Sequence, residues 1–239
     1  MSTSFTRCGK RGVFFDATRQ RSKGVTKVIA RVFFPTYKIR HLRGPTITNK
    51  GGLRLGKARI RGKLVDSQLA KVVGDKLLLA PPPSACVETK QIMAFVRDHG
   101  YYIEHAQYAV GYAPWRLATD IDLVLRTVTG EDHRIVVEVK RGCLYRRHMV
   151  PNTTSQCLEP VVTVSPLHVH QLQAVIGKRL LELCDTTVRI GGAWLLYVDL
   201  LHGVERIEEK DFGVQWSQLS ERALVATAAH LTTRNHGSM

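Results

Sequence analysis

The stretch IDLVLRTVTGEDHRIVVEVK, residues 121–140, decides how the fold of this chain is interpreted. Two apolar runs flank the turn TGED, in which Gly130 is the residue type best able to adopt a positive φ. This pattern predicts two antiparallel strands joined by a short loop. Both runs also contain charged residues, which a fully buried hairpin does not tolerate without partners. These charges are either solvated on a half-exposed sheet or gathered for a purpose.

The charged residues of the hairpin share one face of the predicted sheet. Side chains alternate along a strand, so residues of equal parity point the same way. One face of the two strands holds the charged residues Asp120, Asp122, Glu138 and Lys140. The opposite side holds the apolar residues Ile121, Leu123, Leu125, Val137 and Val139.

The loop centre sets which charged residues face each other. A loop centred on Gly130 pairs residues whose numbers add up to 260, which places Asp122 opposite Glu138 and Asp120 opposite Lys140. A shift to a sum of 262 places Asp122 opposite Lys140 instead. Either register brings the three acids and the lysine within about 5 Å across the strands. A slip of one residue would scatter them and split the apolar face as well.

Facing carboxylates predict a metal site. They repel each other unless a cation lies between them, and hard oxygen ligands on a rigid sheet suit Mg²⁺ or Mn²⁺. Asp122 and Glu138 would hold the ion, and Lys140, about 7 Å along the strand from Glu138, would act on an attacking water or a phosphate. Asp120 is either an additional ligand or an acid that faces Lys140. The alternative is a solvated sheet face with Asp–Lys pairs.

Elements on both sides of the hairpin predict an α/β fold with a small mixed sheet flanked by helices. A helix over 53–73 ends at Gly74, and after three prolines Ser84 caps a helix to about His99, with Glu88 in its first turn. Further on we expect a strand over 101–110, helices over 168–184 and 216–231, and a buried strand, AWLLYVDL. The inner faces of the first two helices are predicted to carry Ile60, Leu64, Val65, Leu69 and Val72, then Val87, Ile92, Phe95 and Val96.

Positive charge is concentrated at the start of the chain. The net charge is +15, yet the residues up to Lys63 hold 17 Lys and Arg against one acid, and the remainder holds 18 basic and 19 acidic residues. This asymmetry indicates a polyanionic partner, most simply nucleic acid. Ribosomal proteins and proteins that bind anionic membranes share the bias. We therefore divide the chain into a basic N-terminal arm, 1–52, with a strand near 26–34, and a domain over 53–239.

The cysteines and the apolar runs indicate a soluble intracellular protein. Five scattered cysteines form no CxxC pair, which is typical of reduced thiols. The first residues lack the apolar core of a secretory signal, and the run GGAWLLYVDLL is too short to span a membrane. We expect no membrane association. The Arg-rich start is compatible with a mitochondrial transit peptide, which we do not favour because the run VIARVFF is typical of folded structure.

The hairpin resembles the core of the PD-(D/E)XK nucleases. That core has an aspartate before three apolar residues, a short turn, and three apolar residues before E-x-K; here these are Asp122 with LVL, and IVV with Glu138 and Lys140. The chain is most similar to the RecB-type exonucleases, a branch that includes the mitochondrial genome maintenance and phage lambda exonucleases. Its Q-h-x-x-Y motif matches Gln171, with Val175 in place of the tyrosine. The resemblance covers residues 54–200.

The resemblance implies a restriction-endonuclease-like core and a role for each matched residue. Asp122 and Glu138 would bind Mg²⁺ or Mn²⁺, Lys140 would act on the water or phosphate, Gln171 would brace the site, and Glu88 would match the acid on the first core helix. The chain departs from the branch where a histidine is frequent, here Asp66, and where an acid is common, here Gln107. These departures leave open an altered metal shell or a weakened enzyme.

Two functions from different classes follow. The first is a metal-dependent, exonuclease-like hydrolase of phosphodiester bonds in DNA. The second is a weak or inactive protein of the same fold that binds nucleic acid as a structural subunit of a replication or repair machine. Basic residues next to the site and on the first helix are candidates for nucleic-acid contact: Arg146, Arg147, Lys57 and Arg61. His168 and His170, beside Gln171, are further candidates for substrate contact.

Overall fold

The structure is a computed structural model that describes residues 5–8, 13–29, 60–75, 81–129, 133–141, 165–200, 202–214 and 216. The strands are β1 (Thr6–Cys8), β2 (Val13–Phe15), β3 (Arg21–Gly24), β4 (Tyr101–Tyr112), β5 (Leu117–Thr127), β6 (His133–Arg141), β7 (Arg189–Asp199) and β8 (Gly203–Glu208). The helices are α1 (Val25–Val28), α3 (Val87–Asp98), α4 (Pro166–Cys184) and a helical stretch over 60–69. Short 3₁₀ turns are η3 (Ala70–Val72), η4 (Ala113–Trp115) and η6 (Glu209–Asp211).

The described strands belong to one mixed sheet, which confirms the α/β class. β4, β5 and β6 follow one another as antiparallel neighbours, β6 and β7 are parallel, and β8 returns antiparallel to β7. The parallel pair requires a crossover, and α4 lies within it. β3 joins the start of β5 in parallel, and β1 and β2 extend the sheet from there.

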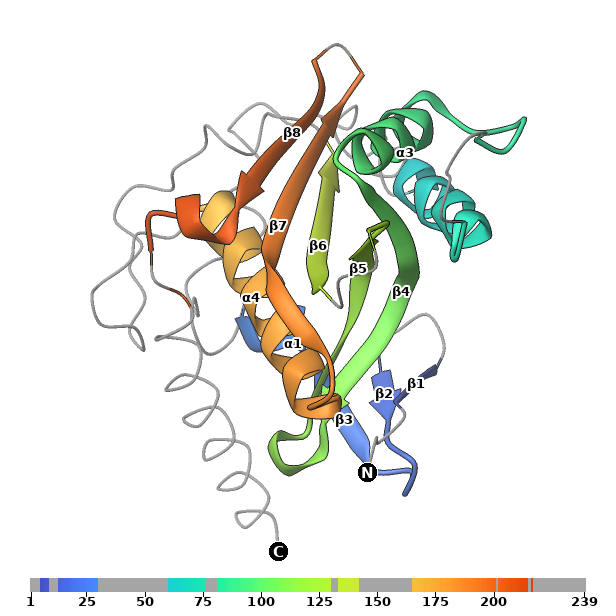
Figure 1. The fold of residues 1–239 in the computed structure, drawn as a ribbon. Helices are drawn as coiled ribbons and strands as arrows, with labels where there is room; N and C mark the ends of the chain where they lie inside the picture. Colours follow the sequence, from blue (N-terminus) through green and yellow to red (C-terminus); the bar gives the residue numbers. More distant parts are fainter. Residues whose placement is uncertain are drawn as a thin grey trace, which may run out of the picture.

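Helices cover both faces of the sheet, so its strands are buried between two apolar cores. Figure 1 shows α4 and α1 against one face, and α3 with the helix of 60–69 against the other. On the α4 side Val124 and Val136 pack with Leu172, Val175 and Ile176 of α4. The α3 side holds the alternate residues of the same strands together with residues of both helices: Leu123, Leu125, Ile135, Val137, Ile92, Val96 and Leu69.

β5 has two different neighbours along one edge. Leu117 and Ala118 pair with β4 on one side and with Lys23 and Gly24 of β3 on the other. Farther along, residues 123–126 pair with β4 and with β6. Because a strand has only two edges, β3 and β6 share the edge opposite β4. Residues 119–122 of β5 therefore lie between the end of one ladder and the start of the next.

The predicted hairpin register is confirmed. The β5–β6 pairs run from Leu123↔Val137 to Arg126↔Arg134, so their residue numbers add up to 260 and the shifted register is excluded. The prediction was wrong for Ile121, which packs in the α4 core and not with Leu123 and Leu125. The β4–β5 register passes from Ala106↔Leu123 to Tyr108↔Ile121, and Gln107 between them has a φ of 50°. Ile121 and Leu123, two residues apart on β5, lie in different cores, while the shift in the β4–β5 register is between Ile103 and His105.

The two helices before the hairpin are present, but their apolar surfaces differ from the prediction. Val65, Leu69 and Val72 are buried, whereas Ile60 and Leu64 are 72% and 44% exposed. The buried residues form one stripe at i, i+4 and i+7, and Ile60 and Leu64 lie beside that stripe.

The start of α3 also differs from the prediction. Its N-cap is Cys86 and not Ser84, so the helix starts later than expected and Val87, its first residue, is 50% exposed. Ile92 and Val96 are buried as predicted, and Glu88 lies in the first turn.

Part of the expected N-terminal arm packs into the sheet and its core. β3 pairs with β5, and Val25, Val28 and Ile29 are buried in the α4 core. The predicted strand near 26–34 is wrong over its described part, because residues 25–28 form α1. The predicted helix over 216–231 lies outside the described residues except for Trp216. No helix of the described ranges combines the length and apolar character that crossing a membrane requires.

Candidate active site

Asp122 lies where β5 and β6 separate. Its carboxylate accepts the backbone N–H of Val139 on β6, at 2.8 Å to Oδ2, and the side-chain amide of Gln107 on β4, at 3.1 Å to Oδ1. The first bond spans the gap just beyond the last pair of the β5–β6 ladder. Both oxygens are thus oriented by neighbouring strands, which fixes the position of the carboxylate without any helix.

Glu138 and Lys140 project from β6 towards α4. In the parallel β6–β7 register they are partners of Leu195 and Tyr197, both members of the α4 core. Glu138 is 4% exposed and forms an ion pair with Lys140 through Oε1. The predicted gathering of Glu138 and Lys140 on one face is confirmed. A charged pair in this buried setting needs further partners. Asp122 is one of them, since its charge affects the pKa of Glu138.

Burial and neighbouring charges shift the pKa values of Glu138 and Lys140. Burial, then the charge of Asp122, raises the pKa of Glu138 to about 8, and a hydrogen bond between the two carboxyl groups adds to the rise, while Lys140 opposes it. Burial alone would lower the pKa of Lys140, but Glu138 and Asp122 hold it above its ordinary value. At neutral pH the site thus contains a charged lysine beside a Glu138 carboxyl group that is largely protonated.

Residues of α4, β7 and the first helix surround this centre. His170, in the first turns of α4, shares a hydrogen bond of 2.9 Å between Nδ1 and the hydroxyl of Tyr197. Burial, then the charge of Lys140, holds the pKa of His170 well below its ordinary value, so the imidazole is neutral. Asp66, on the helix of 60–69, contributes to the raised pKa of Lys140. The position where the resemblance expects a histidine therefore places an acid near the lysine.

The donor set of the site fits a divalent cation. The raised pKa of Glu138 beside Asp122 marks a position where an ion would replace a proton, and both carboxyl groups offer hard oxygen atoms. Over the described ranges, no three His, Cys, Asp or Glu side chains are grouped to share a metal ion. Two carboxylates are the number with which Mg²⁺ is commonly held when water and substrate phosphates complete its shell.

Two other predicted ligands have different surroundings. Asp120 pairs with Ala109 on the β4 side of β5, and the β5–β6 ladder does not reach it. Glu88 is 1% exposed and is bound by Arg61 and by Arg141. Neither residue completes a group of three with Asp122 and Glu138 in the described part of the chain. Their roles as ligands stay predictions.

Gln171 points into the core. It is 1% exposed, and its Oε1 accepts the indole N–H of Trp216 at 2.9 Å. Its expected role in bracing the site stays a prediction. Val175, where the motif has tyrosine, is buried in the α4 core.

The candidate nucleic-acid contacts are only partly described. Lys57, Arg146 and Arg147 lie outside the described residues. Arg61 is described, and its guanidinium is bound to Glu88 while 44% of the side chain remains exposed. Arg141 was missed, although it directly follows Lys140 in the sequence EVKR. Tyr197 was also missed, since a tyrosine within an apolar run ordinarily indicates packing.

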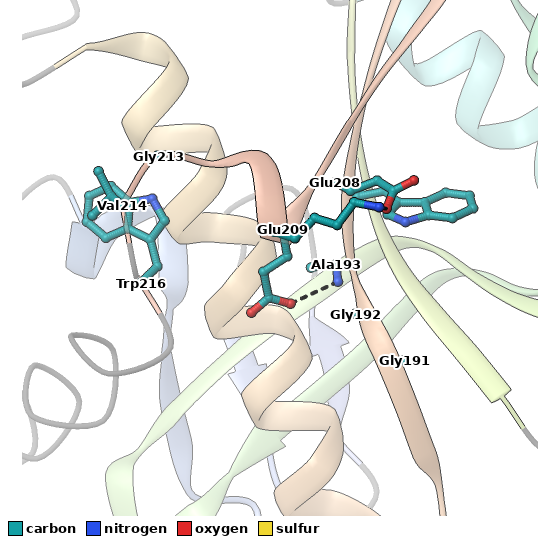
Figure 2. A pocket seen from close by; sticks show the side chains of 10 residues that line it. Gly191, Gly192, Ala193, Glu208, Glu209, Gly213, Val214 and Trp216 are labelled. Carbon is teal, nitrogen blue, oxygen red and sulfur yellow. Dashed lines mark hydrogen bonds and ion pairs between the residues drawn. The ribbon is translucent and has the colours of Figure 1, made fainter.

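A cavity of about 720 Å³ lies apart from these residues, beside β7, β8 and η6. Figure 2 shows Glu209 on its wall, with the carboxylate accepting the backbone N–H of Ala193, and Trp216 at another side. Glu209 is also bound by Lys178 of α4, at 2.8 Å. Asp122, Glu138 and Lys140 do not line the cavity. Its two acids, Glu208 and Glu209, are paired with basic residues, so the cavity does not offer an unpaired carboxylate.

Comparison with known proteins adds no family to this description. A scan against protein-family models finds no match, and no curated protein matches the chain in sequence.

Proposed function

We propose that this chain is a divalent-metal-dependent nuclease that hydrolyses phosphodiester bonds of DNA in an exonuclease-like manner. The observation that carries the proposal is the contact of Asp122 with Glu138, with Lys140 paired to the same glutamate. A buried acid beside a second carboxyl group and a partly buried lysine is expensive to maintain as a structural element. These are the groups that phosphodiester hydrolysis requires.

The order of elements supports a restriction-endonuclease-like core. A helix, α3, precedes three antiparallel strands, β4 to β6, and α4 then leads to β7 beside β6. The aspartate lies on the middle of those strands and the E-x-K residues on the last, as in the PD-(D/E)XK nucleases that the hairpin resembles. The order of the elements and the strands that carry the three residues both agree with that core. This combined agreement is more specific than membership of the α/β class alone.

Each residue has a defined part in the proposed reaction. When bound at Asp122 and Glu138, Mg²⁺ or Mn²⁺ would supply a Lewis acid and lower the pKa of a bound water. Gln107 and the N–H of Val139 fix the orientation of Asp122. Lys140 stays protonated because its pKa is raised, so it neutralises charge that develops on the phosphate and does not remove a proton from water.

A cleavage assay tests the proposal. Linear and circular DNA of one sequence are incubated with the purified chain in Mg²⁺, Mn²⁺ or EDTA, beside the variants Glu138→Gln and Glu182→Gln. We expect cleavage only with metal, and a loss of at least about a hundredfold in Glu138→Gln. Glu182, a partly exposed acid paired with Arg179 on α4, serves as the matched control and should leave cleavage unchanged. Preference for the linear substrate would indicate exonuclease action.

A second function is favoured by a specific observation, the lack of a third acid beside Asp122 and Glu138 among the described residues. Such a site would bind metal weakly, and the chain would then act as a nucleic-acid-binding subunit that keeps the fold. Metal-independent DNA binding without cleavage in any metal would favour this function. Equal cleavage by Glu138→Gln and the wild-type chain would contradict the first.

A further inference from the structure

His170 and Tyr197 form a hydrogen-bonded pair beside Lys140. Tyr197 lies opposite Lys140 in the parallel β6–β7 register, on strands about 4.8 Å apart, and it belongs to the apolar core on the α4 side. Its hydroxyl shares a hydrogen bond of 2.9 Å with Nδ1 of His170, in the first turns of α4. Burial, and then the charge of Lys140, lower the pKa of His170, which requires the two groups to be close. The three residues are therefore neighbours on one face of the sheet.

Solvent reaches Lys140 and His170 but hardly reaches their neighbours Glu138 and Tyr197. Glu138 is 4% exposed and Tyr197 is 1% exposed, whereas 22% of the Lys140 side chain remains exposed. His170 also retains part of its surface, since it is not among the buried residues of α4. A phosphate that contacts the lysine would thus meet the imidazole beside it, and Tyr197 would support the imidazole from the core.

The tyrosine determines which nitrogen of His170 carries the proton. Because the imidazole is neutral, one ring nitrogen is a donor and the other is an acceptor. A phenolic O–H is more acidic than the N–H of a neutral imidazole, so the hydroxyl of Tyr197 donates and Nδ1 accepts. The ring proton is then on Nε2. Since Nδ1 is bonded to Tyr197, the ring would contact a ligand through Nε2–H.

We propose that His170 is a further catalytic residue, whose Nε2–H donates a hydrogen bond to a non-bridging oxygen of the phosphate cleaved at Glu138, and that Tyr197 is its positioning residue. The inference rests on the proposed function for the identity of this ligand. A preorganised neutral donor is effective where negative charge develops in the transition state. Lys140 would supply charge at the phosphate, and His170 would add a fixed direction, which a flexible lysine side chain does not provide.

The same surroundings do not suit His170 as a general base. A base is most effective when its pKa lies near the working pH, whereas burial, then the charge of Lys140, holds the pKa of His170 well below its ordinary value. A lysine that stays charged would also repel the imidazolium that proton transfer produces. The histidine is thus suited to donate a hydrogen bond and not to accept a proton from water.

Replacements of His170 test the donor. Glutamine places an amide N–H close to the position of Nε2, asparagine places one close to Nδ1, and alanine removes both. Cleavage of linear DNA in Mg²⁺ should fall about a hundredfold in His170→Ala and His170→Asn, while His170→Gln should stay within about tenfold of the wild-type chain. The matched control is His202→Gln, in the exposed turn before β8, which should leave cleavage unchanged.

NMR of the imidazole nitrogens in the metal-free chain tests the tautomer without any cleavage. The resonances of His170 are identified by their absence in His170→Gln. We expect the proton on Nε2 in the wild-type chain, and a mixture of both tautomers in Tyr197→Phe, which removes only the hydroxyl. Tyr197→Phe should also lower cleavage about tenfold. It should cost nothing further in a chain that already carries His170→Ala, because the tyrosine acts through the histidine.

Folding of the variants is checked separately. Thermal denaturation identifies any variant that does not fold. If His170→Ala fails this check, the comparison of His170→Gln with His170→Asn decides the result, because both variants keep a polar side chain at this partly exposed position.

The outcomes distinguish this role from the nuclease itself. A proton on Nδ1 in the wild-type chain, or equal losses in His170→Gln and His170→Ala, would overturn the donor even in a chain that cleaves DNA. If the chain does not cleave, a short DNA oligonucleotide added in EDTA should still shift the Nε2 resonance of His170. That shift would support the phosphate contact and contradict the nuclease, whereas an unmoved resonance would overturn the contact as well.

Discussion

Glu138 is the residue of the candidate site whose pKa is raised by burial and by a neighbouring charge. It is buried, it is held between an aspartate and a lysine, and its pKa is raised to about 8. A carboxyl group of this kind retains its proton in the folded chain at a pH at which the unfolded chain has lost it. The folded state is thus adapted to a second positive charge beside Lys140, which a proton supplies and a bound metal ion would supply.

This arrangement predicts how stability depends on pH. Since the folded pKa of Glu138 lies above the ordinary value of 4.5, the group stabilises the fold fully below about 4.5, and that contribution is lost as the pH rises through about 8. In Glu138→Gln the group cannot titrate. The stability of the wild-type chain relative to this variant should therefore decrease with rising pH, by at most about 1.4 kcal/mol per pH unit.

Chemical denaturation in EDTA between pH 5 and pH 9 measures this difference in unfolding free energy. Glu182→Gln is the control, and its difference from the wild-type chain should not follow the same course. A difference for Glu138→Gln that stays constant, or that grows with pH, would show that the buried carboxyl is ionised throughout. Added Mg²⁺ should stabilise the wild-type chain more at pH 8.5 than at pH 6, because the ion would compete with the proton on Glu138.

At the scale of elements, the packing of β4 on β5 positions the strand that carries Asp122. Gly111 of β4 lies opposite Ala118, where β3 joins the other edge of β5. A Cβ at Gly111 would stand 2.8 Å from the Cβ of Ala118, 2.9 Å from the carbonyl oxygen of Leu117 and 2.9 Å from Phe5. Backbone is among these contacts, so the strands have to move to accommodate a side chain.

Gly111→Ala should therefore destabilise the fold by about 1–3 kcal/mol. Gly62→Ala is the matched change, because a Cβ at Gly62 meets nothing within 4 Å and the residue lies in the helix of 60–69. There the replacement should stabilise the chain by up to about 1 kcal/mol through helix propensity. Urea denaturation of both variants measures the two effects. Equal and small changes would contradict the close approach of β4 and β5.

Local patterns in the sequence predict the elements well and their long-range partners poorly. Alternation and Gly130 were sufficient for the register of β5 and β6, because a hairpin register depends on a short loop. The pairing of β3 with β5 joins residues almost a hundred positions apart and leaves no local pattern. Ile121 was assigned to the wrong face because the alternation of β5 breaks between Ile121 and Leu123, which the apolar pattern of the strand does not indicate.

The same distinction applies to the candidate site. Asp122, Glu138 and Lys140 were found from the sequence because all three lie on one hairpin. The arginine partners of Glu88 come from residues 27 and 53 positions away, so its environment could not be read from its place in a first helical turn. Arg141 faces Glu88 only because β6 ends beside α3. Such contacts follow from tertiary packing, which periodicity does not encode.

At the scale of the whole molecule, the excess of basic residues and the proposed site lie in different parts of the sequence. The first 63 residues hold 17 basic residues and one acid, whereas the remainder is close to neutral. The proposed site lies in the neutral remainder, and the helix of 60–69, which carries Arg61 and Asp66, connects the two regions. A basic region in the same chain as the proposed acidic site would attract a polyanion that the site alone repels.

This distribution predicts a DNA affinity that depends strongly on salt but weakly on sequence. Binding to a labelled duplex in EDTA should weaken linearly on a log–log scale between 50 and 200 mM salt, since each phosphate contact releases counterions and contributes about 0.9 to the slope. A slope above about 4 would correspond to more than four phosphate contacts. Duplexes of unrelated sequence should bind with nearly equal affinity, because phosphate contacts carry no base information. An affinity that salt leaves unchanged, or that depends on one sequence, would contradict a role for the basic region in holding DNA.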